Sequence, residues 1–130
     1  MNSNNIRILV IDDDEDIREA LTDALEPSGY TVDCADDGRS ALELSVTNRY
    51  DIAFFDHDLP DTTGVELCKK IELPGAVKVF MSGSFDGNII EREVAFEDAG
   101  GETHYLYKPF MRGEVLAIIE KILARTNGET

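Results

Sequence analysis

The sequence predicts one α/β domain built on a doubly wound parallel sheet, with helices on both faces. Three observations predict this fold: short apolar runs typical of buried strands, apolar residues at helical spacing between them, and regular alternation of the two along the chain. With 130 residues and 42% hydrophobic content, the chain can bury a single core. The order βαβαβαβαβα implies right-handed crossovers, which bring the carboxyl ends of the strands to one edge.

Four runs are expected to be strands buried on both faces, because their apolar residues are continuous and do not alternate with polar ones. They are Ile6 to Ile11, Asp51 to Phe55, Val77 to Met81 and the shorter run Tyr105 to Tyr107. Tyr30 to Cys34 is a fifth candidate strand. These five runs give the predicted sheet its strands.

Apolar side chains at helical spacing mark a helix after each strand. The stripes consist of Ile17, Leu21, Ala24 and Leu25; of Leu42 and Val46; of Val65 and Cys68; of Ile90, Val94 and Phe96; and of Val115, Ile118, Ile119, Ile122 and Leu123. Pro27 and Gly29 are expected to end the first helix. The first five residues and the tail after Ala124 lie outside this pattern.

The charge of the chain limits its partners. Asp and Glu number 27 against 12 Lys and Arg, and the net charge of -15 should repel phosphate backbones and anionic lipids, so direct binding of nucleic acid is not expected. The opening MNSNNIRILVIDDD has no basic region followed by a long apolar run, so no export signal or membrane span is expected. Cys34 and Cys68, far apart and outside any metal-binding pattern, are expected to be buried reduced thiols of a cytoplasmic protein.

Acidic side chains follow two of the predicted strands. Asp12 and Asp13 come after the first strand, and Asp56 ends the third. Two adjacent carboxylates at a strand tip repel each other unless a cation lies between them, and a third completes a set of hard oxygen ligands for Mg²⁺. The acids that continue the first run, Asp14 to Asp16, are interpreted as caps of the following helix.

Two donors follow the fourth and fifth predicted strands. Ser82 ends the fourth strand, and Lys108 follows the fifth. Each has an ordinary explanation alone, since serine is common in turns and lysine on surfaces. Together with the three acids they indicate phosphoryl transfer, which needs a carboxylate nucleophile, a metal ion and donors for the phosphoryl oxygens.

Four motifs then occur in order along the chain. They are Val10-Ile11-Asp12-Asp13, Asp56-xx-Leu59-Pro60-xxx-Gly64, the apolar strand ending at Ser82, and Lys108-Pro109-Phe110. In this order they resemble the receiver domains of bacterial response regulators, the CheY-like family of two-component signalling. The resemblance spans Ile6 to Ala124 and implies a flavodoxin-like (βα)5 sheet with strand order 2-1-3-4-5. It implies a flexible N-terminus at 1–5, a receiver domain at 6–124, and a tail or the start of a linker at 125–130.

The resemblance also implies a role for each pocket residue. Asp56 would be the phosphoacceptor and one of the Mg²⁺ ligands. Asp13 would bind Mg²⁺ directly and Asp12 largely through water, with the backbone carbonyl of Asp58 as a further ligand. Ser82 and Lys108 would bind the phosphoryl oxygens. Tyr105 would be an aromatic switch that turns inward as Ser82 moves, and the Lys108–Pro109 peptide bond would be cis.

Family membership further implies the partners. They are a histidine kinase or a phosphotransfer protein as donor, a downstream protein target or output domain, and a second copy of the chain in a homodimer. The face formed by the fourth helix, fifth strand and fifth helix would carry the output. The domain would not be an enzyme, because it would catalyse only its own phosphorylation and dephosphorylation, with Asp56 and Lys108 as the catalytic residues.

Three positions depart from the family pattern. His57 replaces the usual apolar residue and is interpreted as structural, since a site of hard oxygens gives an imidazole little to bind. Asp58 adds a fourth carboxylate beside the pocket, and Gly83 replaces the commoner alanine. Asp58 and Ser84 occupy positions that tune phosphoryl lifetime in the family, so the sequence leaves that lifetime open.

Two alternatives share parts of this pattern. A haloacid-dehalogenase-type phosphatase also has an apolar strand followed by DxD, as in Asp56-His57-Asp58, but the short chain has no later acidic pair and Asp12 and Asp13 would have no role. A receiver-like adaptor that works without phosphorylation typically lacks a pocket residue, and none is missing. A flavin-binding protein of this topology would need a phosphate loop where the acids stand.

Overall fold

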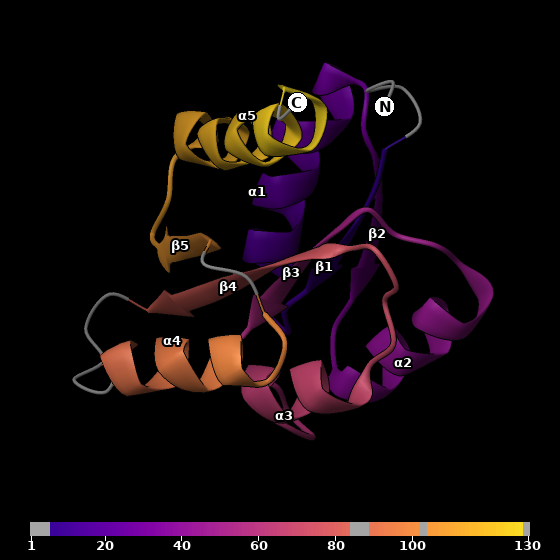
Figure 1. Ribbon diagram of the computed structural model, residues 1–130, viewed down its shortest axis with the longest axis vertical. Coiled ribbons are helices and arrows are strands. Elements are labelled where there is room, and N and C mark those ends of the chain that lie inside the picture. Colours follow the sequence, from indigo (N-terminus) through magenta and orange to yellow (C-terminus); the bar gives the residue numbers. More distant parts are fainter. Residues whose placement is uncertain (1–5, 84–88, 102–103, 129–130) are drawn as a thin grey trace.

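The computed structural model describes residues 6–83, 89–101 and 104–128. Five strands alternate with five helices (Figure 1), and a short 3-10 turn follows the first helix. In chain order they are β1 (Arg7–Ile11), α1 (Glu15–Leu25), β2 (Thr31–Ala35), α2 (Gly38–Thr47), β3 (Ile52–Asp56), α3 (Gly64–Lys70), β4 (Val77–Gly83), α4 (Ile89–Asp98), β5 (His104–Lys108) and α5 (Arg112–Gly128). This is the alternation that the sequence predicts.

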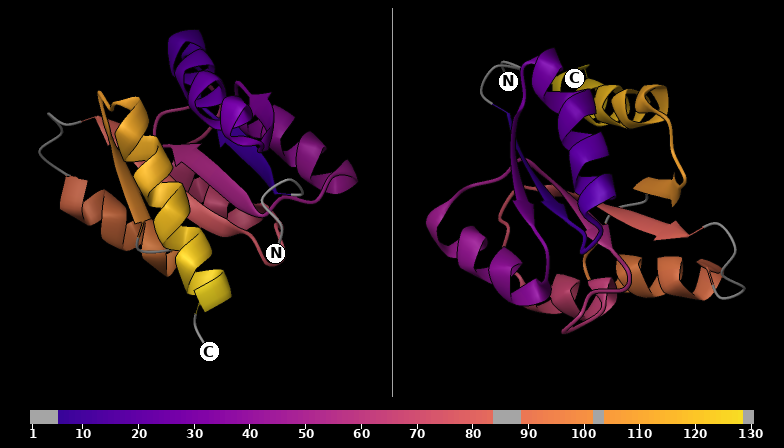
Figure 2. Two further views of the ribbon diagram at one scale, coloured as in Figure 1. Left: turned by 90° about the horizontal axis from the view of Figure 1, so that it is seen from above. Right: turned by 180° about the vertical axis from the view of Figure 1, so that it is seen from behind.

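The strands form one parallel sheet in the order β2-β1-β3-β4-β5, as the resemblance implies. Helices α1 and α5 cover one face, and α2, α3 and α4 cover the other (Figures 1 and 2). The doubly wound, flavodoxin-like fold is therefore confirmed. Among the described residues, none of the helices is long and apolar enough to cross a membrane.

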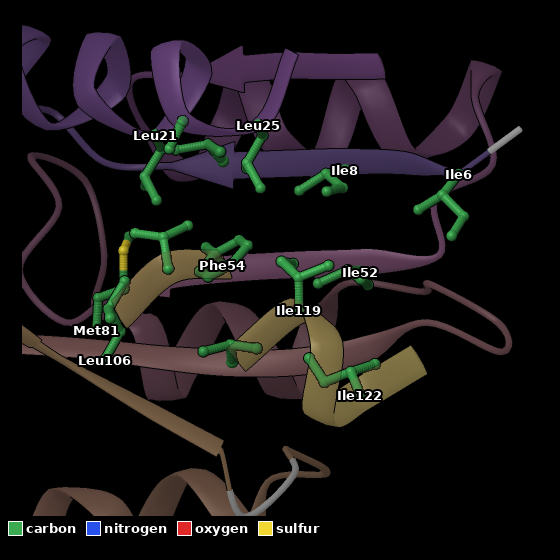
Figure 3. Close-up of a cluster of buried hydrophobic side chains, with 14 residues drawn as sticks. Ile6, Ile8, Leu21, Leu25, Ile52, Phe54, Met81, Leu106, Ile119 and Ile122 are labelled. Atoms are coloured by element: carbon green, nitrogen blue, oxygen red, sulfur yellow. The ribbon is translucent and has the colours of Figure 1, made fainter. Parts of the chain in front are cut away.

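Two apolar clusters fill the space between the sheet and its helices. On the side of α1 and α5, the cluster joins alternate strand residues such as Ile8 and Phe54 to helix residues such as Leu21 and Ile119 (Figure 3). The intervening strand residues, such as Phe55, pack against α2, α3 and α4. Because β1 and β3 lie inside the sheet, both of their faces are buried, which explains their continuous apolar runs.

Two predicted strand positions need correction. β4 continues through Gly83, so Ser82 lies within the strand and not at its end. Tyr105 to Tyr107 was expected to be buried on both faces, but Tyr107 is 42% exposed, because β5 is an edge strand. The other edge strand, β2, is also partly exposed.

Edge position also explains the error for Cys34. Its side chain is exposed on β2, whereas Cys68 on α3 is buried as predicted, and both thiols are free. The fourth helix forms where its spacing predicts, but of its apolar residues Phe96 is buried while Ile90 and Val94 are 73% and 52% exposed. Helix α5 continues through Gly128, beyond Ala124, where the apolar pattern ends.

Candidate functional site

The predicted site residues meet at the carboxyl edge of the sheet. Asp12 follows β1, while Asp56 and Lys108 are the last residues of β3 and β5. Ligand oxygens of Asp12, Asp13 and Asp56 lie within 4.8 Å of one another. Asp12 is fully buried and Asp56 is 6% exposed, whereas Asp13 is open to solvent. The structure therefore brings the three acids into one pocket that is open on one side.

Lys108 bridges the two buried acids. Its Nζ donates to Asp56 Oδ1 at 2.8 Å and lies 2.6 Å from Asp12 Oδ2. Burial lowers the pKa of Lys108, but its hydrogen bonds to Asp12 and Asp56 and their charges outweigh burial and leave that pKa raised. The ammonium is therefore charged at neutral pH, and one cation faces three carboxylates.

The surroundings of the pocket disfavour the charged form of its buried carboxylates. Burial is the largest cause that raises the pKa of Asp56, to about 6, and the charges of Asp12 and Asp13 add to the rise while Lys108 opposes it. Burial likewise raises the pKa of Asp12. A second cation would relieve the repulsion that Lys108 leaves uncompensated.

The raised pKa of Asp56 predicts the stability of the metal-free protein as a function of pH. Between about pH 4 and pH 6, the folded protein holds a proton on Asp56 that the unfolded chain has released, so the free energy of unfolding falls as pH rises through this window. Asp56→Asn cannot titrate and should exceed wild type by on the order of 2 kcal/mol at neutral pH, but not near pH 4. Urea denaturation of both proteins in EDTA checks this, and parallel curves would contradict it.

Backbone contacts fix the loop after β1. The Asp12 amide donates to the carbonyl of Ala35 at 3.0 Å, and Asp12 Oδ1 accepts from the Asp14 amide at 2.9 Å. Arg18 on α1 donates to the Asp12 carbonyl at 2.9 Å. Asp14 caps α1 through the amide of Asp16, as the sequence predicts for this acidic run.

The loop after Asp56 is a small closed hairpin. The Gly64 amide donates to the carbonyl of His57 at 2.8 Å, the Leu59 amide donates to that of Thr62 at 3.1 Å, and Asp58 pairs with Thr63. A Cβ at position 64 would clash with the backbone oxygen of Asp56. The glycine of the second motif therefore lets α3 begin directly over the acceptor.

Ser82 presents a buried hydroxyl on the strand beside Asp56. Met81 is the register partner of Asp56, and Ser82 is the next residue of β4. Its side chain is 2% exposed and makes no hydrogen bond within the described part of the chain. A buried hydroxyl usually has a partner, so this orphan favours a polar group that enters the pocket.

The remaining predicted positions lie around this pocket. Tyr105 is half-buried and packs against the cluster on the α4 side. His57 packs edge-on against Phe80 with ring centroids 5.8 Å apart, in keeping with a structural role. The carboxylate of Asp58 is 81% exposed, and the Lys108–Pro109 bond is cis, as the resemblance implies. Ser84 lies outside the described residues.

Three contacts near the site could not be predicted from the sequence. Arg18 reaches the carbonyl of Asp12, and Asp61 binds the first amides of α2. Tyr107 on β5 donates to Glu93 of α4 at 2.6 Å. Each joins residues from different elements, and no spacing rule predicts such a pair.

Comparison with known proteins agrees with this geometry. The profile of the response regulator receiver domain family matches residues 8–120. The response regulator MprA of Mycolicibacterium vanbaalenii is 39% identical over 121 residues, which cover 93% of this chain and 52% of that protein. MprA of Mycobacterium ulcerans is 38% identical over 125 residues. The chain thus spans about half the length of the curated relatives it matches.

Solved structures give the same assignment. A two-component response regulator from Clostridium difficile superposes with a TM-score of 0.85 at 31% identity, covering 95% of this chain and 99% of that one. A CheY-like receiver domain protein from Methanospirillum hungatei has the same TM-score and identity, with 96% and 98% covered. The profile match, the relatives and the shared fold establish that this chain belongs to the response regulator receiver domain family of two-component systems.

Proposed function

We propose that this receiver domain accepts a phosphoryl group on Asp56 from a histidine kinase or a phosphotransfer protein, with Mg²⁺ as cofactor. The observation that carries the proposal is the combination of a buried, lysine-paired carboxylate with the buried Ser82 hydroxyl, which has no partner in the described part of the chain. A phosphoryl group on Asp56 would give Ser82 and Lys108 a common anionic partner. Among the alternatives, the family assignment disfavours a dehalogenase-type phosphatase, and the complete pocket disfavours a phosphorylation-independent adaptor.

The donor set of the pocket fits Mg²⁺. Asp12, Asp13 and Asp56 offer carboxylate oxygens, and the carbonyl of Asp58 would add a neutral one; Mg²⁺ prefers oxygen ligands and keeps several waters. Asp13 lies on the open side, where such waters have room. Receiver domains typically bind Mg²⁺, and here its charge would offset the repulsion between Asp56 and an incoming phosphoryl group.

The transfer itself requires little more than positioning. A carboxylate oxygen of Asp56 attacks phosphorus, the new O–P bond forms as the P–N bond to the donor histidine breaks, and the imidazole nitrogen keeps the electron pair. The ammonium of Lys108, now 2.8 Å from Asp56 Oδ1, would bind one phosphoryl oxygen and the Ser82 hydroxyl another. The domain would thus catalyse only its own modification and its reversal.

Intact mass spectrometry tests the proposed function. The full chain, incubated with acetyl phosphate and Mg²⁺, should gain the mass of one phosphoryl group, and EDTA should prevent the gain because the pocket then keeps its uncompensated negative charge. No gain under any Mg²⁺ concentration that leaves the protein folded would overturn the proposal.

The output surface that we propose lies on α4, β5 and the start of α5. Four large apolar side chains are exposed there: Ile90, Val94, Tyr107 and Met111. Exposed apolar groups on neighbouring elements favour a protein-binding surface. With the net charge of -15, the partner would be a downstream protein target, an output domain or a second copy of the chain, and not nucleic acid. In this proposal the protein acts in the cytoplasm.

The exposed carboxylate of Asp58 should affect how long Asp56 stays phosphorylated. It lies two residues beyond the acceptor and points to solvent, where water must approach to hydrolyse the phosphoryl group. Asp58→Ala should change the dephosphorylation rate several-fold without lowering the melting temperature, since the side chain is not packed. Phosphate release after removal of the donor measures the rate, and equal half-lives for the two proteins would show that the carboxylate has no part in hydrolysis.

A further inference from the structure

Asp61, at the tip of the loop after β3, binds a helix that comes earlier in the chain. Its Oδ1 accepts from the Gly38 amide at 2.8 Å and its Oδ2 from the Arg39 amide at 3.0 Å. The next amide, that of Ser40, donates to Asp37 at 2.7 Å. Two of the three free amides at the start of α2 are therefore satisfied by a residue more than twenty positions away, and one by the helix's own N-cap.

Asp61 contacts α2 closely and through both of its carboxylate oxygens. A Cβ added to Gly38 would lie 2.6 Å from Thr62 Cγ2 and 3.2 Å from Asp61 Oδ1. The tip of the loop therefore presses against the first residue of α2, and glycine at position 38 leaves room for it. Carboxylate-to-amide bonds at a helix N-terminus are charge-assisted, and the Gly38 amide is the main cause that lowers the pKa of Asp61.

The same end of α2 lies close in the chain to the acid pocket. Two residues separate Gly38 from Ala35, whose carbonyl accepts from the amide of Asp12 at 3.0 Å. The hairpin closed by Gly64 and His57 carries Asp58, whose carbonyl is the proposed metal ligand. Asp12 is thus hydrogen-bonded to the end of β2, a short stretch of backbone leads from there to the start of α2, and the first amides of α2 are hydrogen-bonded to the loop after β3.

We propose that Asp61 is a positioning residue for the phosphoryl-transfer site: by fastening the loop after β3 to α2, it holds the carbonyl of Asp58 at a fixed place relative to Asp12 and Asp13. This inference rests on the proposed function. Outer partners of metal ligands typically contribute tenfold or more to metal affinity, because they remove the need to order a ligand on binding. Asp61 therefore raises the Mg²⁺ affinity that the ligands themselves provide, and it takes no direct part in the transfer step.

The test compares Asp61→Ala with Asp37→Ala in the full chain. Both variants remove one negative charge and one cap from the same helix, but Asp37 does not bind the loop. Because the chain has no tryptophan, the Kd for Mg²⁺ is measured by NMR shift titration, and phosphorylation by acetyl phosphate is then followed against Mg²⁺ concentration. Asp61→Ala should raise both the Kd and the half-saturating Mg²⁺ concentration roughly tenfold, with the saturated rate within about twofold of wild type. Asp37→Ala should keep the Kd and the half-saturating Mg²⁺ concentration near their wild-type values, although its melting temperature should fall about as much as that of Asp61→Ala.

A second variant disturbs the contact between α2 and the same loop without removing the carboxylate of Asp61. Gly38→Ala should push Thr62 away and also weaken Mg²⁺ binding, and Thr62→Ser in the same chain should restore much of the affinity, because it removes the methyl group that a Cβ at position 38 would meet. An unchanged Kd in Asp61→Ala, or an equal rise in Asp37→Ala, would overturn the inference. If wild type bound Mg²⁺ but took up no phosphoryl group, the proposed function would fail while the Kd comparison would still decide the role of Asp61.

Discussion

Asp56→Asn should abolish phosphorylation by acetyl phosphate in the presence of Mg²⁺. An amide is no nucleophile, and Asn also removes one of the negative charges that would hold the metal ion. Neither neighbouring acid is placed as Asp56 is: Asp12 is fully buried beside Lys108, and the side chain of Asp58 points to solvent. Intact mass spectrometry over the time in which wild type is fully modified should therefore detect no added phosphoryl group.

A matched control separates the loss of the nucleophile from the loss of charge. Asp23→Asn makes the same substitution at an exposed position of α1, outside the pocket, and should be phosphorylated at the wild-type rate. Since Asp56→Asn should be more stable than wild type at neutral pH in the absence of metal, unfolding would not explain its inactivity. Phosphorylation of Asp56→Asn at the wild-type rate would refute the assignment of the acceptor.

The sequence predicts the sheet well because burial leaves a strong signal in the interior strands. Phe54 and Phe55 point to opposite faces of β3, and both are fully buried, so their run is apolar throughout. In the two edge strands this signal is weaker, which is why the burial of Cys34 and Tyr107 was predicted wrongly. Ile90 and Val94 show a different limit, since helical spacing identifies α4 but cannot say that these two apolar residues face solvent.

The sequence predicts which residues form the site, but it does not predict the contacts that these residues make with one another. Parallel strands end at one edge, so acids and donors after successive strands had to lie near one another. That rule does not say that Lys108 contacts both Asp12 and Asp56, nor that the Ser82 hydroxyl has no hydrogen-bond partner among the residues that the structure describes. Asp61 escaped prediction because an acid in a loop is ordinary, and its partner amides at the start of α2 become visible only once α2 and the loop are packed together.

Lys108→Ala should destabilise the metal-free protein and also disconnect phosphorylation from the output surface. Removing the ammonium leaves Asp12 and Asp56 buried without the cation that now contacts both. Breaking a buried ion pair in this way costs on the order of 3 kcal/mol at neutral pH, and less near pH 4, where the carboxylates can protonate. Mg²⁺ should restore much of this loss, since the proposed ligands do not include Lys108.

The stability part is measured by urea denaturation in EDTA and again in Mg²⁺. Lys69→Ala is the control, because it removes a lysine from an exposed pair with Glu66 and should cost at most about 1 kcal/mol, with no dependence on Mg²⁺. A Lys108→Ala protein as stable as Lys69→Ala in EDTA would show that the buried acids do not need the ammonium.

The switching part follows from where Lys108 and Ser82 lie in the sheet. They lie on neighbouring strands in which Ser82 pairs with Tyr107 and Gly83 with Lys108. If a phosphoryl group draws both side chains toward Asp56, we expect β4 and β5 to shift together. Tyr105 lies on the same strand, and Tyr107 donates to Glu93 of α4 at 2.6 Å, so the shift reaches the proposed output surface. A charge-assisted hydrogen bond is worth about 1.5 to 3 kcal/mol, enough to move a two-state equilibrium at least tenfold.

Without Lys108, one of the two bonds that would pull on these strands is missing. NMR shift mapping with a stable phosphoryl mimic and Mg²⁺ should therefore show changes at Tyr105 and along α4 in wild type and in Lys69→Ala, but changes confined to the pocket in Lys108→Ala. The same pattern at Tyr105 and α4 in all three proteins would mean that Ser82 alone drives the switch. Because Lys108→Ala should still bind Mg²⁺ and still carry the Asp56 nucleophile, loss of the distant changes alone would separate signalling from phosphorylation within one pocket.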